Sequence, residues 1–184
     1  MRLSHSLAAA AAGFSTTTAA SFADTCTVSY VQSSLPTKGT LLGLSFDSTS
    51  VTANPVYNAS VVAGTNYPAA SYDYCNVSLS YSHDGRGDVV HLQYWFPAPD
   101  KFQNRYLSTG GGGYAINSGT QSLPGGVMYG AVAVVTDGGF GSFKTNMDAV
   151  VLKANGSINW DEVFMYVSCG QSLCTLCSAP EPGD

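Results

Sequence analysis

The sequence predicts an α/β domain built around a mixed or parallel β-sheet. Two stretches, 75–83 and 90–96, alternate apolar and polar residues as half-buried strands do, and a turn-forming segment joins them. Residues 130–136, GAVAVVT, form the continuous apolar run of a strand buried on both faces. Between these stretches, the short strand candidate 105–109, RYLST, runs directly into four consecutive glycines, residues 110–113.

The first two predicted strands form a β-hairpin. Their apolar faces are Val77, Leu79 and Tyr81 in the first strand and Val90, Leu92, Tyr94 and Phe96 in the second. The segment HDGRGD between them is rich in turn formers, and Pro97 with Pro99 ends the second strand. Outside the hairpin, residues 24–74 read as an irregular arm with weak strand content, and a helix is expected to start near Asn159 or Asp161.

The N-terminus has the pattern of a secretory signal peptide. Arg2 precedes a short apolar stretch, residues 7–14, and small residues follow up to Ala23, after which cleavage is expected. The apolar stretch is too short for a membrane anchor. The net charge of −5, with only seven Lys and Arg, would repel phosphate backbones. We therefore expect a secreted, extracellular protein without nucleic-acid or membrane partners.

Two further features agree with export. Glycosylation acceptor motifs occur at Asn58, Asn76 and Asn155. Of five cysteines, Cys26 and Cys75 are the natural disulfide pair in an oxidising compartment. The pairing of the other three, Cys169, Cys174 and Cys177, is left open by the sequence.

The four glycines admit three interpretations. A phosphate cradle would need a following Lys-Ser/Thr or a GxGxxG pattern opening a helix, and neither is present. A flexible linker would be longer. The third interpretation is a tight loop whose backbone N–H groups approach a substrate oxygen, as after the third strand of an α/β-hydrolase. A purely structural glycine turn is its main competitor.

Three segments, 74–119, 122–141 and 155–164, carry a resemblance to a known family. They include YCNVSLSYSH, STGGGGYAINSG, SLPGGVMYGAVAVVTDGGFG and NGSINWDEVF. In this order and spacing they resemble the opening part of the fungal tannase and feruloyl esterase family, from about Cys26 to about Met165. The resemblance implies a secreted serine esterase with an α/β-hydrolase core, acting on gallate or hydroxycinnamate esters. It also implies that Gly112 or Gly113 supplies an oxyanion N–H.

The catalytic triad that the resemblance implies is not identifiable in this chain. The family places its serine in a Gly-Cys-Ser-x-Gly-Gly turn, and the nearest match here, GQSLC around Ser172, lacks the required strand before it. His5 lies in the signal peptide, His83 lies in the hairpin turn and His91 lies within a strand. Asp84 and Asp88 read as a solvated turn, and Asp137 as a turn former.

No metal or cofactor is expected. The tail motif Cys174-Thr175-Leu176-Cys177 has only Cys169 nearby, whereas a structural zinc needs four ligands. The calcium ion of the family belongs to a lid that is not expected in this chain.

The sequence is thus divided into a signal peptide, 1–23, an incomplete α/β-hydrolase domain, 24–165, and a divergent tail, 166–184. This domain should contain the hairpin, a third and a fourth strand and the oxyanion loop, without nucleophile turn or lid, and should expose the edge of its last strand. Two functions remain: a truncated, inactive esterase, whose full-length form takes a small aromatic ester, or a non-catalytic secreted binding module that uses Tyr114 and other exposed tyrosines.

Overall fold

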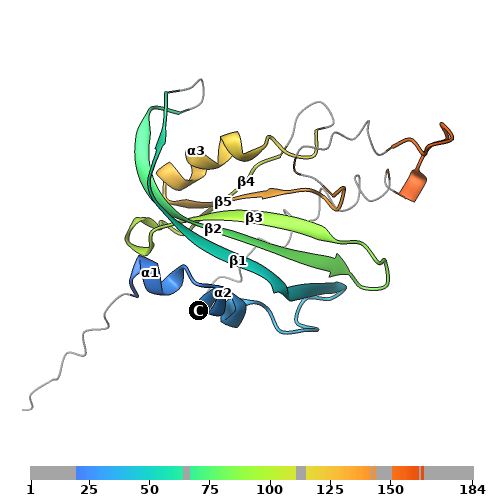
Figure 1. Ribbon diagram of the computed structural model, residues 1–184, viewed down its shortest axis with the longest axis horizontal. Coiled ribbons are helices and arrows are strands. Elements are labelled where there is room, and N and C mark those ends of the chain that lie inside the picture. The colour runs from blue at the N-terminus through green and yellow to red at the C-terminus, as the bar shows by residue number, and fades with distance from the viewer. Residues whose placement is uncertain are drawn as a thin grey trace, which may run out of the picture.

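The computed structural model describes residues 20–63, 67–110, 115–141, 143, 151–161 and 163. Its centre is a five-stranded sheet in the order β1-β2-β3-β5-β4 (Figure 1). The strands are β1 (Leu44–Val61), β2 (Ala70–His83), β3 (Val90–Pro97), β4 (Arg105–Ser108) and β5 (Ala131–Thr136). Neighbouring strands are antiparallel except β4 and β5, which are parallel. The mixed sheet predicted from the sequence is therefore present.

The predicted hairpin is formed by β2 and β3. Leu79 pairs with Leu92, and Tyr81 pairs with Val90. These four side chains are all buried, which confirms the inward face expected from their alternation. Phe96, at the end of the same face, is 37% exposed.

Strand β5 confirms the prediction of a strand buried on both faces. Ala133, Val134 and Val135 are 0%, 3% and 1% exposed. Val134 packs into one apolar cluster with residues of β2 and β3, whereas Val135 packs into a second cluster with Leu123 and Val127. The continuous apolar run is thus required because each face of β5 meets a separate core.

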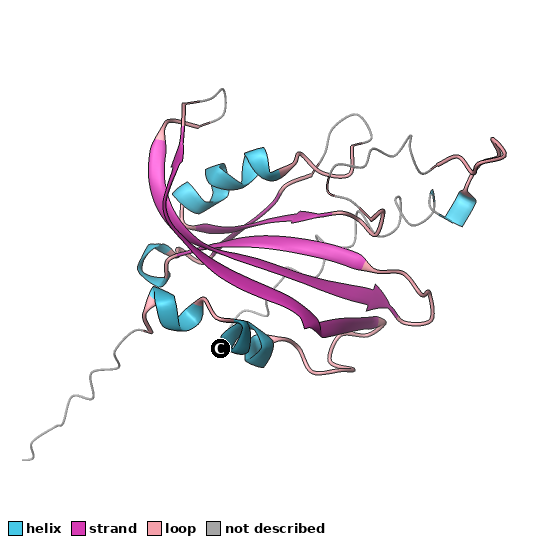
Figure 2. Cartoon of the chain, in the orientation of Figure 1, coloured by secondary structure: helices cyan, strands magenta, loops and turns pink. Residues whose placement is uncertain are grey.

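Short helices cover the two faces of the sheet (Figure 2). Helix α3 (Leu123–Met128) supplies Leu123 and Val127 to one core, while α1 (Phe22–Thr25) and α2 (Val28–Ser34) pack on the opposite face. The predicted disulfide is present: Cys26, between α1 and α2, is bonded to Cys75 of β2. It fastens the N-terminal helices to the sheet.

The prediction that residues 24–74 form an irregular arm is wrong. These residues include the end of α1, all of α2 and the 18-residue strand β1. Strand β1 pairs with β2 from Leu44 opposite His83 to Val61 opposite Ala70. Strand β1 lies at the edge of the sheet, and only Val51 in it is buried. Because an edge strand needs little apolar burial and two register shifts interrupt it, its periodicity in the sequence is weak.

The prediction of an open edge also requires correction. The last strand, β5, lies between β3 and β4. After β4 the chain crosses over through α3 and comes back to the sheet on the side of β4 that faces β3. The edge opposite β1 is therefore β4, whose four residues are all exposed.

The expected helix start is confirmed: residues 160 and 161 are helical, and the Val163 N–H donates to the Asn159 carbonyl over 3.1 Å. In the described part of the chain, no helix has the length and apolar character needed to span a membrane.

Candidate functional site

The carboxyl ends of the parallel strands β4 and β5 form the candidate site. The chain leaves β4 at Ser108 into the glycine-rich loop, and it leaves β5 at Thr136 into the turn that starts with Asp137. Loops at the carboxyl ends of parallel strands are the usual place for ligand sites in open α/β sheets. Gly112 and Gly113 lie outside the described residues, so their role as oxyanion donors stays a prediction.

The described flanks of the glycine-rich loop are hydrogen-bonded to β5. The backbone N–H and the hydroxyl of Thr109 each donate to the Val134 carbonyl over 3.0 Å. On the other side, Asn117 Nδ2 donates to the Thr136 carbonyl over 2.7 Å. The loop therefore leaves and rejoins the sheet at two points on one strand.

Asn117 also organises the return of the loop. Its Oδ1 accepts the Gly119 N–H over 2.7 Å, and the neighbouring Ser118 hydroxyl donates to the Gly110 carbonyl. Asn117 is only 8% exposed, so both of its hydrogen bonds are shielded from water. Sequence reasoning did not single out Asn117, because one polar residue in a Gly/Ser-rich loop carries no local signal.

Asp137 lies beneath the turn that follows β5. Its Oδ1 accepts the backbone N–H groups of His91 and Gly139, over 2.8 and 2.9 Å, and its Oδ2 lies 2.7 Å from His91 Nδ1. Asp137 is 1% exposed. The expected turn-forming role of Asp137 is confirmed by the bond to Gly139, whereas the pairing with His91 was missed.

The His91 ring is held in one orientation. A carboxylate at Nδ1 favours the tautomer with its proton on that atom, which leaves the Nε2 lone pair on a side chain that is 49% exposed. Within the described residues, no hydrogen bond joins His91 Nε2 to a hydroxyl group. The pair therefore anchors the turn that follows β5.

The description of Asp84 and Asp88 as a solvated turn is wrong for Asp88. Its carboxylate accepts the His83 N–H over 2.9 Å and lies 2.5 Å from His83 Nδ1, and the His83 and Asp88 side chains are only 19% and 10% exposed. Burial raises the pKa of Asp88, but the hydrogen bonds from the His83 side chain and backbone outweigh it and lower that pKa overall. Asp84 is exposed and accepts the Ser45 hydroxyl over 2.7 Å.

The three glycosylation candidates differ in their surroundings. Asn58 and Asn155 are exposed, whereas Asn76 is partly buried within β2 and accepts the Gln93 amide over 3.0 Å. Modification at any of them stays a prediction. The other singled-out residues, His5, Tyr114, Cys169, Ser172, Cys174 and Cys177, lie outside the described residues.

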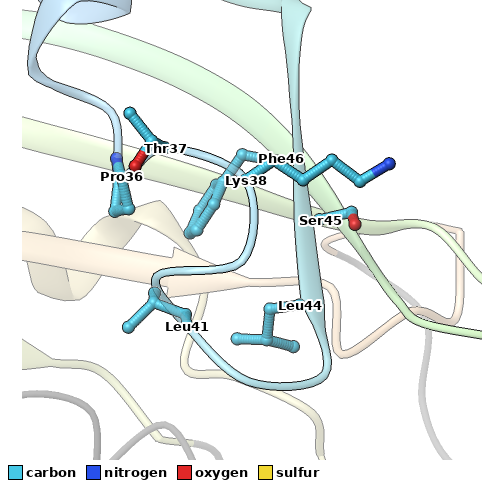
Figure 3. A pocket seen from close by; sticks show the side chains of 7 residues that line it. All are labelled: Pro36, Thr37, Lys38, Leu41, Leu44, Ser45 and Phe46. Carbon is cyan, nitrogen blue, oxygen red and sulfur yellow. The ribbon is translucent and has the colours of Figure 1, made fainter.

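The described surface includes the following three hollows. The first, between the α2–β1 connection and the start of β1, has a volume of about 160 Å³ and is lined by residues such as Lys38, Leu41 and Phe46 (Figure 3). That is below the size of typical small-molecule sites. The others are an apolar groove of about 470 Å³ on the α1 and α2 face and a mixed cavity of about 420 Å³ beside Gly130.

No group of three or more His, Cys, Asp or Glu side chains suited to a metal ion occurs within the described ranges.

Comparison with known proteins gives three findings. A family model described as tannase and feruloyl esterase matches residues 75–175. A tannase from Aspergillus oryzae is 47% identical over 162 residues, covering 88% of this chain and 26% of that protein. A probable feruloyl esterase from Arthroderma benhamiae is 33% identical over 101 residues, covering 55% of this chain and 19% of its own length.

Among solved structures, a tannin acyl hydrolase from Aspergillus niger superimposes with a TM-score of 0.73 at 54% identity. The match covers 79% of this chain and 26% of the other chain. The chain thus spans about a quarter of the length of the tannases that it matches.

Proposed function

This chain belongs to the tannase and feruloyl esterase family, and on that premise we propose that it is the oxyanion-loop part of a secreted serine esterase for gallate or hydroxycinnamate esters. The observation that carries the proposal is the position of the glycine-rich loop. It follows β4 at the carboxyl end of the parallel pair, and Thr109 and Asn117 tie its flanks to β5. The substrate class comes from the family.

The loop would act by stabilising negative charge. During ester hydrolysis the carbonyl oxygen becomes an oxyanion, and backbone N–H donors that already point at its position lower the barrier without reorganisation. Gly112 or Gly113 would supply such a donor, because the absence of a Cβ lets the backbone come close to the substrate. The hydrogen bonds of Thr109 and Asn117 support this role, since they restrict where the loop starts and ends.

The catalytic serine, aspartate and histidine would come from a longer product of the same gene. No Gly-Cys-Ser-x-Gly-Gly segment occurs in this sequence, and the open edge of β4 provides a place for a further strand. We accordingly expect the 184-residue chain to be an incomplete α/β-hydrolase domain without nucleophile turn or lid, and to be inactive.

Secretion is part of the same proposal. Residues 1–23 would be removed as a signal peptide, and Asn58, Asn76 and Asn155 are candidates for glycosylation. The disulfide between Cys26 and Cys75 supports folding in an oxidising compartment, where such bonds persist.

The first test is sequencing of the transcript across the codons for Trp160 to Asp184, followed by assays with methyl gallate and methyl ferulate. We expect a longer message that encodes Gly-Cys-Ser-x-Gly-Gly and a product that hydrolyses at least one ester. In that product, Gly112→Ala or Gly113→Ala should lower kcat/KM by up to about 10²–10³-fold, the loss for one oxyanion donor, because the added Cβ keeps the N–H away from the substrate. Hydrolysis by the 184-residue chain itself would contradict the proposal, and a confirmed stop with a stable monomer would favour the binding module.

A further inference from the structure

The cavity of about 420 Å³ lies at the end of the sheet opposite the glycine-rich loop. Gly130, directly before β5, lines it, whereas the loop is tied to the other end of this six-residue strand. At about 3.3 Å per residue, the two sites are about 20 Å apart. The volume of the cavity is within the range of small-molecule sites, so it is a candidate binding site separate from the loop.

Part of the cavity wall comes from residues with flat, largely apolar side chains. Tyr72 of β2 and Tyr129 at the end of α3 line it, together with Pro97. The Tyr72 ring lies 5.8 Å from that of Tyr74, which stacks on Trp95 at 4.1 Å, so Tyr72 is held by an aromatic row. Tyr129 is 55% exposed at the rim. Such faces favour an aromatic ring as the ligand.

Two aspartates are also among the residues that line the cavity. Asp73 Oδ1 accepts the Asn58 N–H of β1 over 2.7 Å, whereas Asp100 Oδ2 lies 3.1 Å from the exposed Lys101 amine. Within the described residues, no hydrogen bond occupies the second oxygen of Asp100. A carboxylate accepts hydrogen bonds strongly, so this oxygen would recognise a ligand that carries hydroxyl donors.

We propose that this cavity binds a polyhydroxylated aromatic ring of the galloyl type, as a second site remote from the glycine-rich loop. The ring would lie against Tyr72 and Tyr129, and a hydroxyl group would donate to Asp100. The location comes from the cavity, while the ligand class rests on the proposed function. A substrate that carries several such rings would then be held at two places.

The test is calorimetric titration of the secreted 184-residue chain with gallamide, whose amide replaces the ester and avoids hydrolysis. We expect saturable binding that Tyr129→Ala weakens about tenfold or more through loss of the ring face. Asp100→Asn should weaken it severalfold, because a neutral amide accepts less strongly than a carboxylate. Trimethoxybenzamide, which has the ring without the donors, should bind at least about tenfold more weakly than gallamide.

Tyr30→Ala is the matched control. Tyr30 is 49% exposed and lines the apolar groove on the opposite face, so its loss should leave gallamide affinity unchanged. The proposal is overturned if gallamide does not bind, if Tyr30→Ala is the weakening variant, or if methyl glucoside binds equally well. Ester hydrolysis by a longer gene product would stand in each of these cases, so the two proposals fail separately.

Discussion

Two histidine–aspartate pairs lie in this sheet, and they differ in how the chain brings them together. His83 and Asp88 are five residues apart and close the β2–β3 hairpin, whereas His91 and Asp137 are 46 residues apart and join β3 to the end of β5. Both carboxylates accept from the backbone and from Nδ1 of their histidine. Asp137, however, is 1% exposed and holds a second backbone group, the Gly139 N–H.

The comparison shows that one interaction type can stabilise quite different parts of a fold. The His83–Asp88 pair stabilises a turn that the hairpin ladder already brings close. The His91–Asp137 pair connects the two strands and the turn that borders the candidate site. Breaking the second pair should therefore cost more stability, and three experiments examine this difference.

The largest effect is expected for Asp137→Ala. It removes the acceptor of two backbone N–H groups and of the half-exposed His91 ring. Each buried donor left unsatisfied costs about 1–3 kcal/mol, so a loss of about 3–5 kcal/mol is expected. Urea denaturation measures the loss, with Asp88→Ala as the matched control at about half of it. Equal losses of unfolding free energy for Asp137→Ala and Asp88→Ala would contradict the expectation that the His91–Asp137 pair contributes more stability.

An intermediate effect is expected from one glycine in each of the two turns that these carboxylates stabilise. Gly138 and Gly85 both have positive φ, +63° and +79°, so alanine is strained at either position by about 1–2 kcal/mol. A Cβ on Gly138 would also lie 3.0 Å from the Phe140 ring and 3.1 Å from Ile116, whereas a Cβ on Gly85 meets nothing within 4 Å. Gly138→Ala should therefore cost about 1 kcal/mol more than Gly85→Ala. The same denaturation midpoint for both would show that the turn after β5 adjusts freely.

The smallest effect is a pH dependence in the hairpin. Because the pKa of Asp88 is lowered in the folded state, its contribution is present above the ordinary value of 3.8 and is lost as the pH falls through the folded-state pKa. Asp88→Asn should cost about 1 kcal/mol at pH 7, and this difference should shrink as the pH is lowered below about 4. Denaturation curves at several pH values test this. A difference that grows on acidification would mean that the pKa of Asp88 is not lowered.

The features predicted from the sequence are those with a local signal. The alternation in β2 and β3, the apolar run of β5 and the turn at Asp137 each depend on neighbouring residues, and the structure confirms them. No local sequence pattern indicated that β5 lies inside the sheet or that Asn117 ties the loop to β5. Each depends on which strands pair, and at what register, across a crossover connection.

The sequence by itself determined the elements that bury apolar side chains at a regular period, together with the Cys26–Cys75 bond and membership of an esterase family. The tertiary structure alone decided that β1 forms one edge, that β4 forms the other, and that His91 meets Asp137. The reason is physical: periodicity records which face of a segment avoids water, but an edge strand hides little surface from water. A pair of polar side chains from distant strands likewise meets only when the register of the sheet is set.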